Sequence, residues 1–277
     1  MSKLWVVGFA MLALACGHRR LSGSELDRVQ RPAFISRIED DAGPRALVFR
    51  EDGAYGGKLK KLDAKEADRR LAVKLQRGLT RFELSDRLRA TTLSGLPAES
   101  PWTHAVDPAS VATVLESFLV EEVPANPPDY ELLRPLGADA VVEFVISEYG
   151  MHSRNGRAGA YFKGYARMFF LDGAEAWRHP IDEDELELST PHLDPFAVGK
   201  TPELYRARMV ALVDRLAKRF VSELSPKDRR GGPAVKPVTR ELSAPPDDTN
   251  RTGKENRPPP AAPEEDALPP GELPDPD

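Results

Sequence analysis

Cysteine is almost absent from this sequence. The one cysteine, Cys16, has no second thiol in the chain with which to form a disulfide. An oxidising compartment usually disfavours a stray free thiol, and a cysteine whose thiol is consumed by a modification avoids this problem. The position of Cys16 in the sequence therefore bears on its role. Cys16 directly follows the apolar segment Leu4 to Ala15 (LWVVGFAMLALA).

Long apolar runs are absent as well. A helix that crosses a bilayer needs about 20 apolar residues, and the charge-free segment from Leu4 to Ala15 is shorter than that. Its length fits the apolar region of a secretory signal, which is normally about 7 to 15 residues. Lys3 supplies the positive start of such a signal. Residues 1–15 are therefore predicted to be a signal peptide.

The junction before Cys16 resembles the bacterial lipoprotein signal, in which a small residue precedes a cysteine that is acylated and becomes the new N-terminus. Ala13 and Ala15 carry the resemblance, although the pattern prefers leucine at position 13 and a small residue where Leu14 stands. It implies lipidation of Cys16, with palmitate-type chains. An aspartate directly after the cysteine would retain such a lipoprotein at the inner membrane. Gly17 stands there instead, so the resemblance implies an outer-membrane lipoprotein that faces the periplasm. An ordinary secretory signal with an incidental cysteine, or an uncleaved N-terminal anchor, remains the alternative.

A strong excess of basic charge is also missing. The net charge is -5, with 40% hydrophobic and 30% charged residues, which is typical of a solvated globular protein. This balance gives no electrostatic reason to expect nucleic acid as a partner.

Aromatic residues are absent from Ser225 onward, where half of the 26 prolines fall. Such a segment cannot bury enough apolar surface to offset its ordering entropy. Residues 225–277 are therefore predicted to be a disordered, proline-rich tail, acting either as a solvated tail without a ligand or as a semi-extended spacer. Residues 16–31 are predicted to be a tether, and residues 32–224 a globular domain.

The first half of this domain contains several helix signals. Residues 45–50 (RALVFR) are predicted to form a short buried strand, followed by a glycine-rich turn over residues 52–57. Asp63 is expected to cap a helix whose apolar positions lie three or four apart, and Gly78 leaves a division into two segments open. Asp107 and Pro108 are expected to begin another helix, and a short helical turn over residues 130–133 is expected to end at Gly137.

The second half carries the strongest strand signals. Residues 140–149, 161–171 and 175–181 are predicted strands of an antiparallel three-stranded meander, with Asp172 and Gly173 in a hairpin turn and residues 150–160 in a mobile loop. Thr201 is expected to cap a long helix whose apolar face docks on the sheet. Its basic residues are expected to be a solvated face, the alternative being contact with anionic lipid or glycan. The expected fold class is α/β (α+β), a single domain with this meander and one additional strand packed by helices.

Residues 132–224 resemble a group of periplasmic-facing lipoproteins and related domains. The group includes the curli-secretion lipoproteins, the outer-membrane activators of penicillin-binding proteins and the amino-terminal domain of the TolB translocation protein. The resemblance rests on the order of Leu136, Gly137, Ala138, Asp139, Asp172, Gly173, Trp177 and the helix from Pro202. It implies an anticodon-binding-like fold used for protein contacts or assembly. Gly137, Asp172, Gly173 and Trp177 would be structural residues of that fold.

The sequence contains no recognisable catalytic or phosphate-binding motif. Gly56, Gly57 and Lys58 are not a phosphate loop, because Leu59 replaces the serine or threonine that binds magnesium. The acidic run over residues 182–187 is expected to be a solvated connector. The histidines are scattered, and none forms a close pair with another in the sequence; they are His18, His104, His152, His179 and His192.

No catalytic residue, cofactor or metal site is therefore expected. The sequence favours a non-enzymatic envelope lipoprotein that binds or helps to assemble another envelope protein. The alternatives are an accessory subunit of a transport or secretion assembly, or a cell-wall-acting enzyme with no recognisable motif. The oligomeric state stays open.

Overall fold

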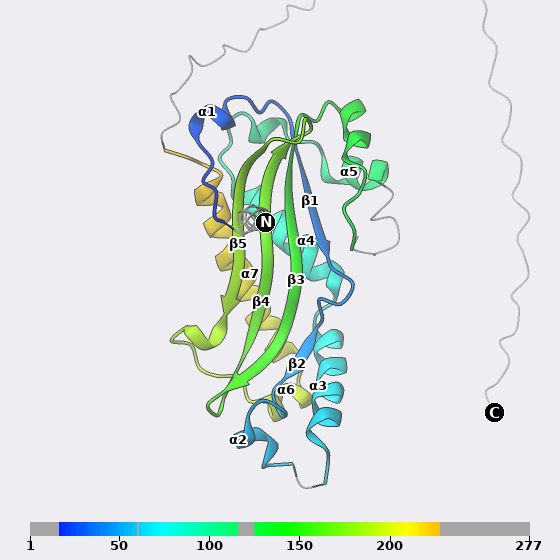
Figure 1. The fold of residues 1–277 in the computed structure, drawn as a ribbon, viewed down its shortest axis with the longest axis vertical. Helices are drawn as coiled ribbons and strands as arrows, with labels where there is room; N and C mark the ends of the chain where they lie inside the picture. Colours follow the sequence, from blue (N-terminus) through cyan, green and yellow to red (C-terminus); the bar gives the residue numbers. More distant parts are fainter. Residues whose placement is uncertain (1–16, 60, 116–124, 228–277) are drawn as a thin grey trace, which may run out of the picture. The chain divides into compact units, whose positions relative to one another are not determined.

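A five-stranded mixed sheet forms the centre of the fold (Figure 1). The computed structural model describes residues 17–59, 61–115 and 125–227, so Cys16, the predicted signal peptide and nearly all of the proline-rich tail lie outside the described residues. The sheet and its helices confirm the predicted mixed α and β fold class. Within the described ranges, no helix has both the length and the apolar character needed to span a bilayer.

The strand order in the sheet is β1 (Pro32–Ile38), β3 (Ala140–Arg154), β4 (Arg157–Phe170) and β5 (Glu175–Asp184). β3, β4 and β5 are successive antiparallel neighbours. β1 and the short β2 (Arg45–Leu47) both run parallel to β3, one beside its first half and the other beside Gly150 to His152. β1 and β2 therefore lie along the same edge of β3, one after the other.

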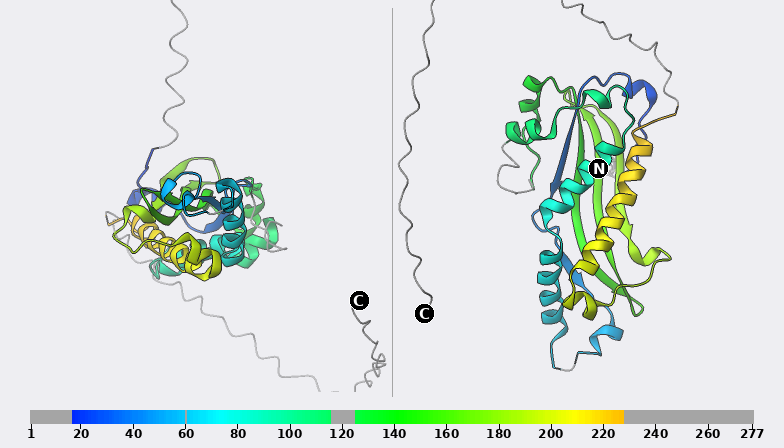
Figure 2. Two further views of the ribbon diagram at one scale, coloured as in Figure 1. Left: turned by 90° about the horizontal axis from the view of Figure 1, so that it is seen from below. Right: turned by 180° about the vertical axis from the view of Figure 1, so that it is seen from behind.

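Two helices, α4 (Arg81–Gly95) and α7 (Glu203–Glu223), lie across one face of the sheet, as Figure 2 shows from behind. The apolar side of α7 docks on the sheet as predicted, because Met209, Val213, Leu216, Phe220 and Leu224 are all fully buried. α3 (Ala64–Gly78) lies beside β2, and α6 (Pro195–Lys200) packs against α3 and α7.

A second, smaller core forms on the other side of β1 and β3. Ile35 and Val141 pack there with Val111 of α5 (Pro108–Leu115) and Leu133 of the 3-10 helix η2 (Tyr130–Leu136). Gly137 ends η2 with a φ of 78°, which confirms the predicted helix end. The remaining short helices are α1 (Gly23–Leu26), α2 (Gly53–Gly56), η1 (Trp102–His104) and η3 (Glu185–Glu187).

Local capping signals predicted the starts of α3 and α5 correctly: α5 begins at Pro108, and the Asp107 carboxylate accepts a hydrogen bond from the Ser110 amide. The Asp63 carboxylate accepts hydrogen bonds from the Lys65 and Glu66 amides and begins α3. The division near Gly78 is confirmed, since Leu79 is extended and Thr80 caps a separate helix, α4. α7 differs from the prediction: it begins at Glu203 after Pro202 without a side-chain cap, while Thr201 ends α6.

Strand β1 has no counterpart among the predicted elements. All seven of its residues are buried, so its sequence lacks the alternation of apolar and polar positions that marks a half-exposed strand. The predicted strand over residues 45–50 is shorter in the structure. The amides of Val48, Phe49 and Arg50 donate to the carboxylate of Asp68 on α3, which ends the strand at Leu47.

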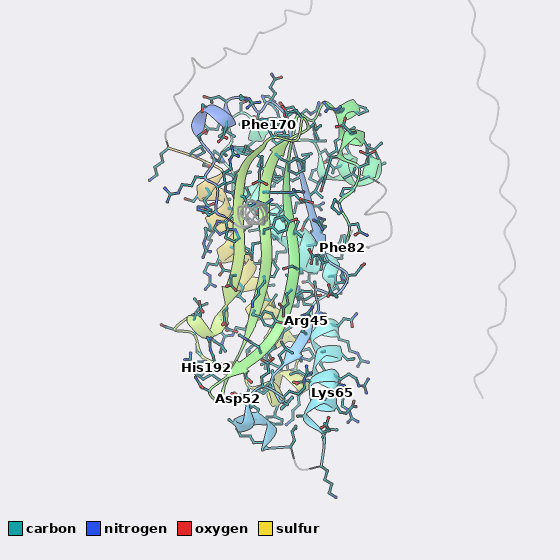
Figure 3. All side chains as sticks on the ribbon, in the orientation of Figure 1. Arg45, Asp52, Lys65, Phe82, Phe170 and His192 are labelled. Carbon is teal, nitrogen blue, oxygen red and sulfur yellow. The ribbon has the colours of Figure 1, made fainter. Side chains whose placement is uncertain are left out.

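The prediction of a mobile loop over residues 150–160 is wrong. β3 continues to Arg154 and β4 starts at Arg157, with Asn155 and Gly156 at φ angles of 56° and 73° between them. An Asn-Gly pair in the left-handed region is the preferred two-residue hairpin turn. Asp52, labelled in Figure 3, accepts a hydrogen bond from the Gly156 amide and also caps α2, which lies in the segment predicted as a glycine-rich turn.

The acidic run is not a solvated connector. Glu183 at the end of β5 and Glu185 in η3 are each only 4% exposed. Glu183 pairs with Arg215 and Arg219 of α7, and Glu185 pairs with Arg208 of the same helix. The prediction of a purely solvated basic face on α7 is therefore wrong for these three arginines.

Residues 17–31 also differ from the predicted tether. The backbones of Arg19 and Arg178 exchange two hydrogen bonds, of 2.8 and 3.0 Å, so this segment pairs with β5. α1 begins with a capping box between Ser22 and Glu25. Leu21, Leu26 and Val29 join the main core. The domain thus begins well before residue 32, and we call residues 17–22 the N-terminal strap.

Candidate functional site

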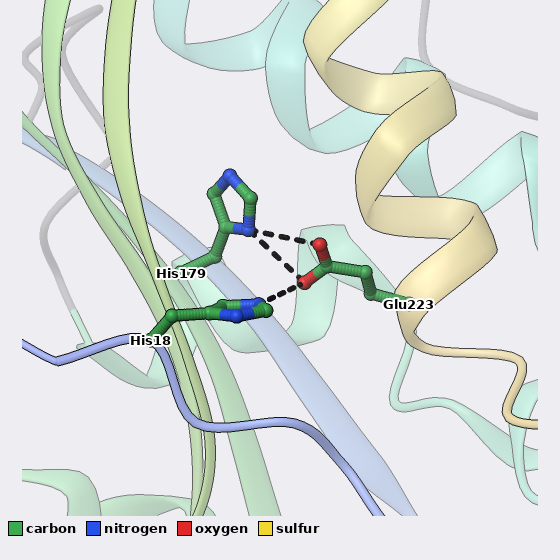
Figure 4. A group of neighbouring side chains, drawn as sticks. All are labelled: His18, His179 and Glu223. Carbon is green, nitrogen blue, oxygen red and sulfur yellow. Dashed lines mark hydrogen bonds and ion pairs between the residues drawn. The ribbon is translucent and has the colours of Figure 1, made fainter.

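Two histidines and a glutamate from three separate parts of the chain converge at the N-terminal strap (Figure 4). A carboxylate oxygen of Glu223 lies 3.2 Å from Nε2 of His18 and 3.0 Å from Nδ1 of His179. The three potential ligand atoms all lie within 4.8 Å of one another. The indole Nε1 of Trp177 donates a 2.9 Å hydrogen bond to the same carboxylate. We call these four residues the His-Glu cluster.

The fold brings the cluster together through ordinary packing. Trp177 and His179 are two residues apart on β5, so their side chains lie on the same face. Both contact the ring of Phe220, at centroid distances of 5.4 Å. Glu223 follows Phe220 by three residues and so lies one helical turn further along the same side of α7. The pairing of Arg19 with Arg178 then places His18 beside His179, with ring centroids 5.2 Å apart.

The electrostatics of the cluster favour an ionised carboxylate beside a neutral imidazole. Burial alone would raise the pKa of the Glu223 carboxyl, but hydrogen bonds from Trp177, His18 and His179 together hold it below its usual value. Burial lowers the pKa of His179, and its attraction to Glu223 only partly opposes this. Neutral imidazole and carboxylate are the forms that bind metal ions. A groove of about 530 Å³ adjoins the cluster and is lined by His18 and Glu223 with Arg20 and Leu21.

The opposite face of the sheet, which is turned toward the viewer in Figure 1, carries a different group of side chains. Tyr165, Arg167 and Phe169 alternate along β4, and Arg178 lies opposite Arg167 on β5. The Arg178 guanidinium lies 5.0 Å from the ring centre of Tyr165, and that of Arg167 lies 4.6 Å from the ring centre of Phe169. All four side chains are half-buried. We call them the arginine-aromatic face.

A buried ionic cluster supports one edge of this face. Glu143 is fully buried on β3 and accepts hydrogen bonds from Arg37 Nε at 2.7 Å, from Arg167 Nε at 2.5 Å and from the Tyr130 hydroxyl. Burial alone would raise the pKa of Glu143, but these three donors keep it below its usual value. The carboxylate therefore fixes the position of Arg167.

The residues predicted as structural lie at turns and in the core. Asp172 and Gly173 form the β4–β5 turn, where Asp172 accepts from the Ala174 amide and Gly173 has a φ of 92°. Trp177 is fully buried against Phe220, as expected for a ring between the hairpin and the long helix. Of the predicted residues only Trp177 belongs to the His-Glu cluster, and Cys16 lies outside the described residues.

Sequence reasoning missed His18, His179 and Glu223. The spacing of His179 from Trp177, two residues along a strand, shows that the two side chains share a face. Nothing local relates His18 to Glu223, which are 205 residues apart. The histidine at 152, which the sequence leaves without a role, instead contacts Asp184 through Nε2 at 2.8 Å.

No protein-family model and no curated protein matches this sequence. Among solved structures, the hypothetical protein CT253 from Chlamydia trachomatis is similar at 11% sequence identity and a TM-score of 0.28. The match covers 70% of this chain and 98% of that one.

Proposed function

We propose that this protein is a non-enzymatic lipoprotein, anchored at Cys16 to the periplasmic side of the outer membrane, that binds or helps to assemble another envelope protein. The arginine-aromatic face is the observation that carries the binding proposal. Arginine, tyrosine and phenylalanine are among the residues enriched in protein interfaces. Here they lie side by side on a regular sheet, which holds them in place before a partner arrives.

The rigidity of this face adds to the argument. Glu143 holds the guanidinium of Arg167 on β4. On the neighbouring β5, Glu175 accepts hydrogen bonds from both Nε and Nη2 of Arg178. Side chains that are already ordered lose little conformational entropy on binding. The four side chains of the face remain half-buried and so keep surface to offer a partner.

The N-terminal strap supports a short connection to the membrane. His18 stands two residues after Cys16 in the sequence and contacts Glu223, the last residue of α7. An acyl anchor on Cys16 would therefore hold the domain close to the bilayer, with the end of α7 nearby. The proline-rich tail would begin at this same end of the domain, so a spacer role would start from the anchored side.

The anticodon-binding-like arrangement is the finer part of the proposal. The sequence resemblance over residues 132–224 supports it, as does the order of β3, β4, β5 and α7 along the chain. In that group the domain is used for protein contacts and assembly, in line with a binding role for the arginine-aromatic face.

Site-specific photocrosslinking in cells tests the binding role. A photoreactive amino acid replaces exposed Lys163, on β4 beside the face, and in a matched variant replaces exposed Val73 on α3. We expect a discrete crosslinked envelope protein from position 163 that disappears when Arg178→Glu is added, and no such product from position 73. Equal crosslinking from both positions, or crosslinks that survive Arg178→Glu, would contradict the proposal.

Labelling with an acyl-chain probe tests the anchor separately. The wild-type protein should incorporate the probe and float with outer-membrane fractions, whereas Cys16→Ala should do neither. Equal labelling of Cys16→Ala would rule out lipidation at this position without affecting the binding test.

A further inference from the structure

We propose that His18, His179 and Glu223 form a binding site for a divalent transition-metal ion of the zinc class. Two imidazole nitrogens and one carboxylate are a common ligand set for such ions, with the remaining coordination positions left to water. The inference goes beyond the proposed function and does not depend on it.

The spacing of the donor atoms fits one shared ion. Zinc binds nitrogen and oxygen ligands at about 2.0 to 2.2 Å, so two ligands of a tetrahedral site stand roughly 3.3 Å apart. The Glu223 oxygens lie 3.2 Å from His18 Nε2 and 3.0 Å from His179 Nδ1. These separations match that requirement, and the two nitrogens lie within 4.8 Å of each other.

The surroundings of the carboxylate fit a metal ligand as well. Trp177 is fully buried and its indole donates to Glu223 Oε2, which orients the carboxylate toward the two imidazoles. Such second-layer hydrogen bonds are typical of metal sites, where they fix ligand orientation. The side chain of His18 is 37% exposed, that of Glu223 24% and that of His179 11%, so an ion can reach the site from solvent.

A hydrogen-bonded cluster without metal is the competing interpretation. In it, each imidazole donates to Glu223 and the cluster simply fastens the strap. The two interpretations differ in what added metal does: only a metal site gives saturable binding that needs all three side chains together.

Metal binding would couple the strap to the domain. The three ligands come from the strap, from β5 and from α7, so an ion can bind all of them only while the strap is docked. By linkage, an ion that prefers the docked state stabilises that state. Bound metal should therefore protect the Arg19 amide, which donates to the Arg178 carbonyl at 2.8 Å.

Calorimetric titration of zinc into the metal-stripped full-length protein is the direct test. His18→Ala, His179→Ala and Glu223→Gln each remove one ligand, and Glu223→Gln does so with almost no change in shape. His104→Ala is the matched control, because His104 is an exposed histidine outside the cluster. Hydrogen exchange of a peptide containing Arg19, with and without zinc, provides a second measurement on the same proteins.

We expect one zinc ion to bind the wild-type and His104→Ala proteins equally. Each ligand variant should bind it at least about 10-fold more weakly, since even second-layer changes cost about 10- to 100-fold. Zinc should slow exchange at Arg19 in the wild type and not in His18→Ala. Absence of saturable binding to the wild type, or binding that is unchanged in both His18→Ala and Glu223→Gln, would overturn the proposal.

Discussion

Replacing Glu143 with glutamine tests how much of the fold's stability depends on its buried ionic cluster. The variant keeps the shape of the side chain but removes the negative charge that faces Arg37 and Arg167, whose side chains are 6% and 24% exposed. Removing one partner of a buried ion pair typically costs about 3 to 5 kcal/mol, because the other charge stays buried without compensation. The amide oxygen still accepts one hydrogen bond, so we expect a loss near about 3 kcal/mol.

Urea unfolding followed by circular dichroism measures this loss. With a slope of about 2 kcal/mol per molar urea, the midpoint should fall by about 1.5 M. The matched control is Glu66→Gln, because Glu66 also pairs with two arginines, Arg69 and Arg70, but on the exposed surface of α3. The control should shift the midpoint far less, since water and salt screen an exposed pair.

The lowered pKa of Glu143 determines how this contribution to stability changes with pH. The folded-state pKa of Glu143 lies below its ordinary value of 4.5. Its contribution to stability is therefore fully present above that value and is lost as the pH falls through the lowered folded pKa. The stability gap between wild type and Glu143→Gln should be constant near neutral pH and should narrow in acid, because Arg37, Arg167 and Tyr130 around the carboxylate keep their charge states there.

A triple variant separates charge from shape. Glu143→Leu combined with Arg37→Met and Arg167→Met replaces the three charged side chains of the cluster by apolar ones and should recover most of the loss, because no buried charge is left unpaired. The reasoning fails if Glu143→Gln is as stable as the wild type, or if its stability gap from the wild type does not change between neutral and acid pH.

Three further predictions concern single positions. Gly137→Ala should lower the free energy of unfolding by about 1 to 2 kcal/mol in thermal melts, because a φ of 78° disfavours a side chain even where space is available. Gly199→Ala is the control and should cost little, since no atom lies within 4 Å of where the added methyl group would stand. Trp177→Phe keeps most of the buried ring but leaves Glu223 without its indole donor, so urea unfolding should show a loss of about 1.5 to 3 kcal/mol; an unchanged midpoint would contradict the importance of this bond. Asp68→Asn removes the charge that accepts three amides after β2, and amide exchange there should rise without global unfolding; unchanged exchange would show that the carboxylate is not what holds the segment.

The helix starts and the main hairpins follow from short stretches of sequence. Asp63 and Thr80 cap their helices through amides two or three residues away, and Gly137 ends η2 because it tolerates a positive φ. The Asn155-Gly156 turn obeys an equally local rule, yet the polar and glycine-rich residues around it favour a loop. Its strands are stabilised by pairing with each other and by Asp52, which lies 104 residues away from Gly156 in the sequence.

Strand β1 and the true role of the acidic run depend on long-range contacts. β1 is covered on both faces, by α4 on one side and by α5 on the other, so its residues show no alternation. In the sequence, nothing distinguishes Glu183 from a solvated acidic residue. In the fold, Arg215 and Arg219 of α7 form ion pairs with it. A charged side chain can be buried only when such partners are present, and its sequence neighbours do not show them.

Features that depend on neighbouring residues could be predicted from the sequence: the apolar segment before Cys16, the caps of α3 and α5, the alternation of β4 and the turn at Gly173. Which distant side chains meet depends on the tertiary fold. His18, His179 and Glu223 come together because the strap pairs with β5 and α7 packs on the same strand. Capping and turn formation act within a few residues, whereas the contacts that form a site are made after the chain has folded back on itself, between residues that no local pattern relates.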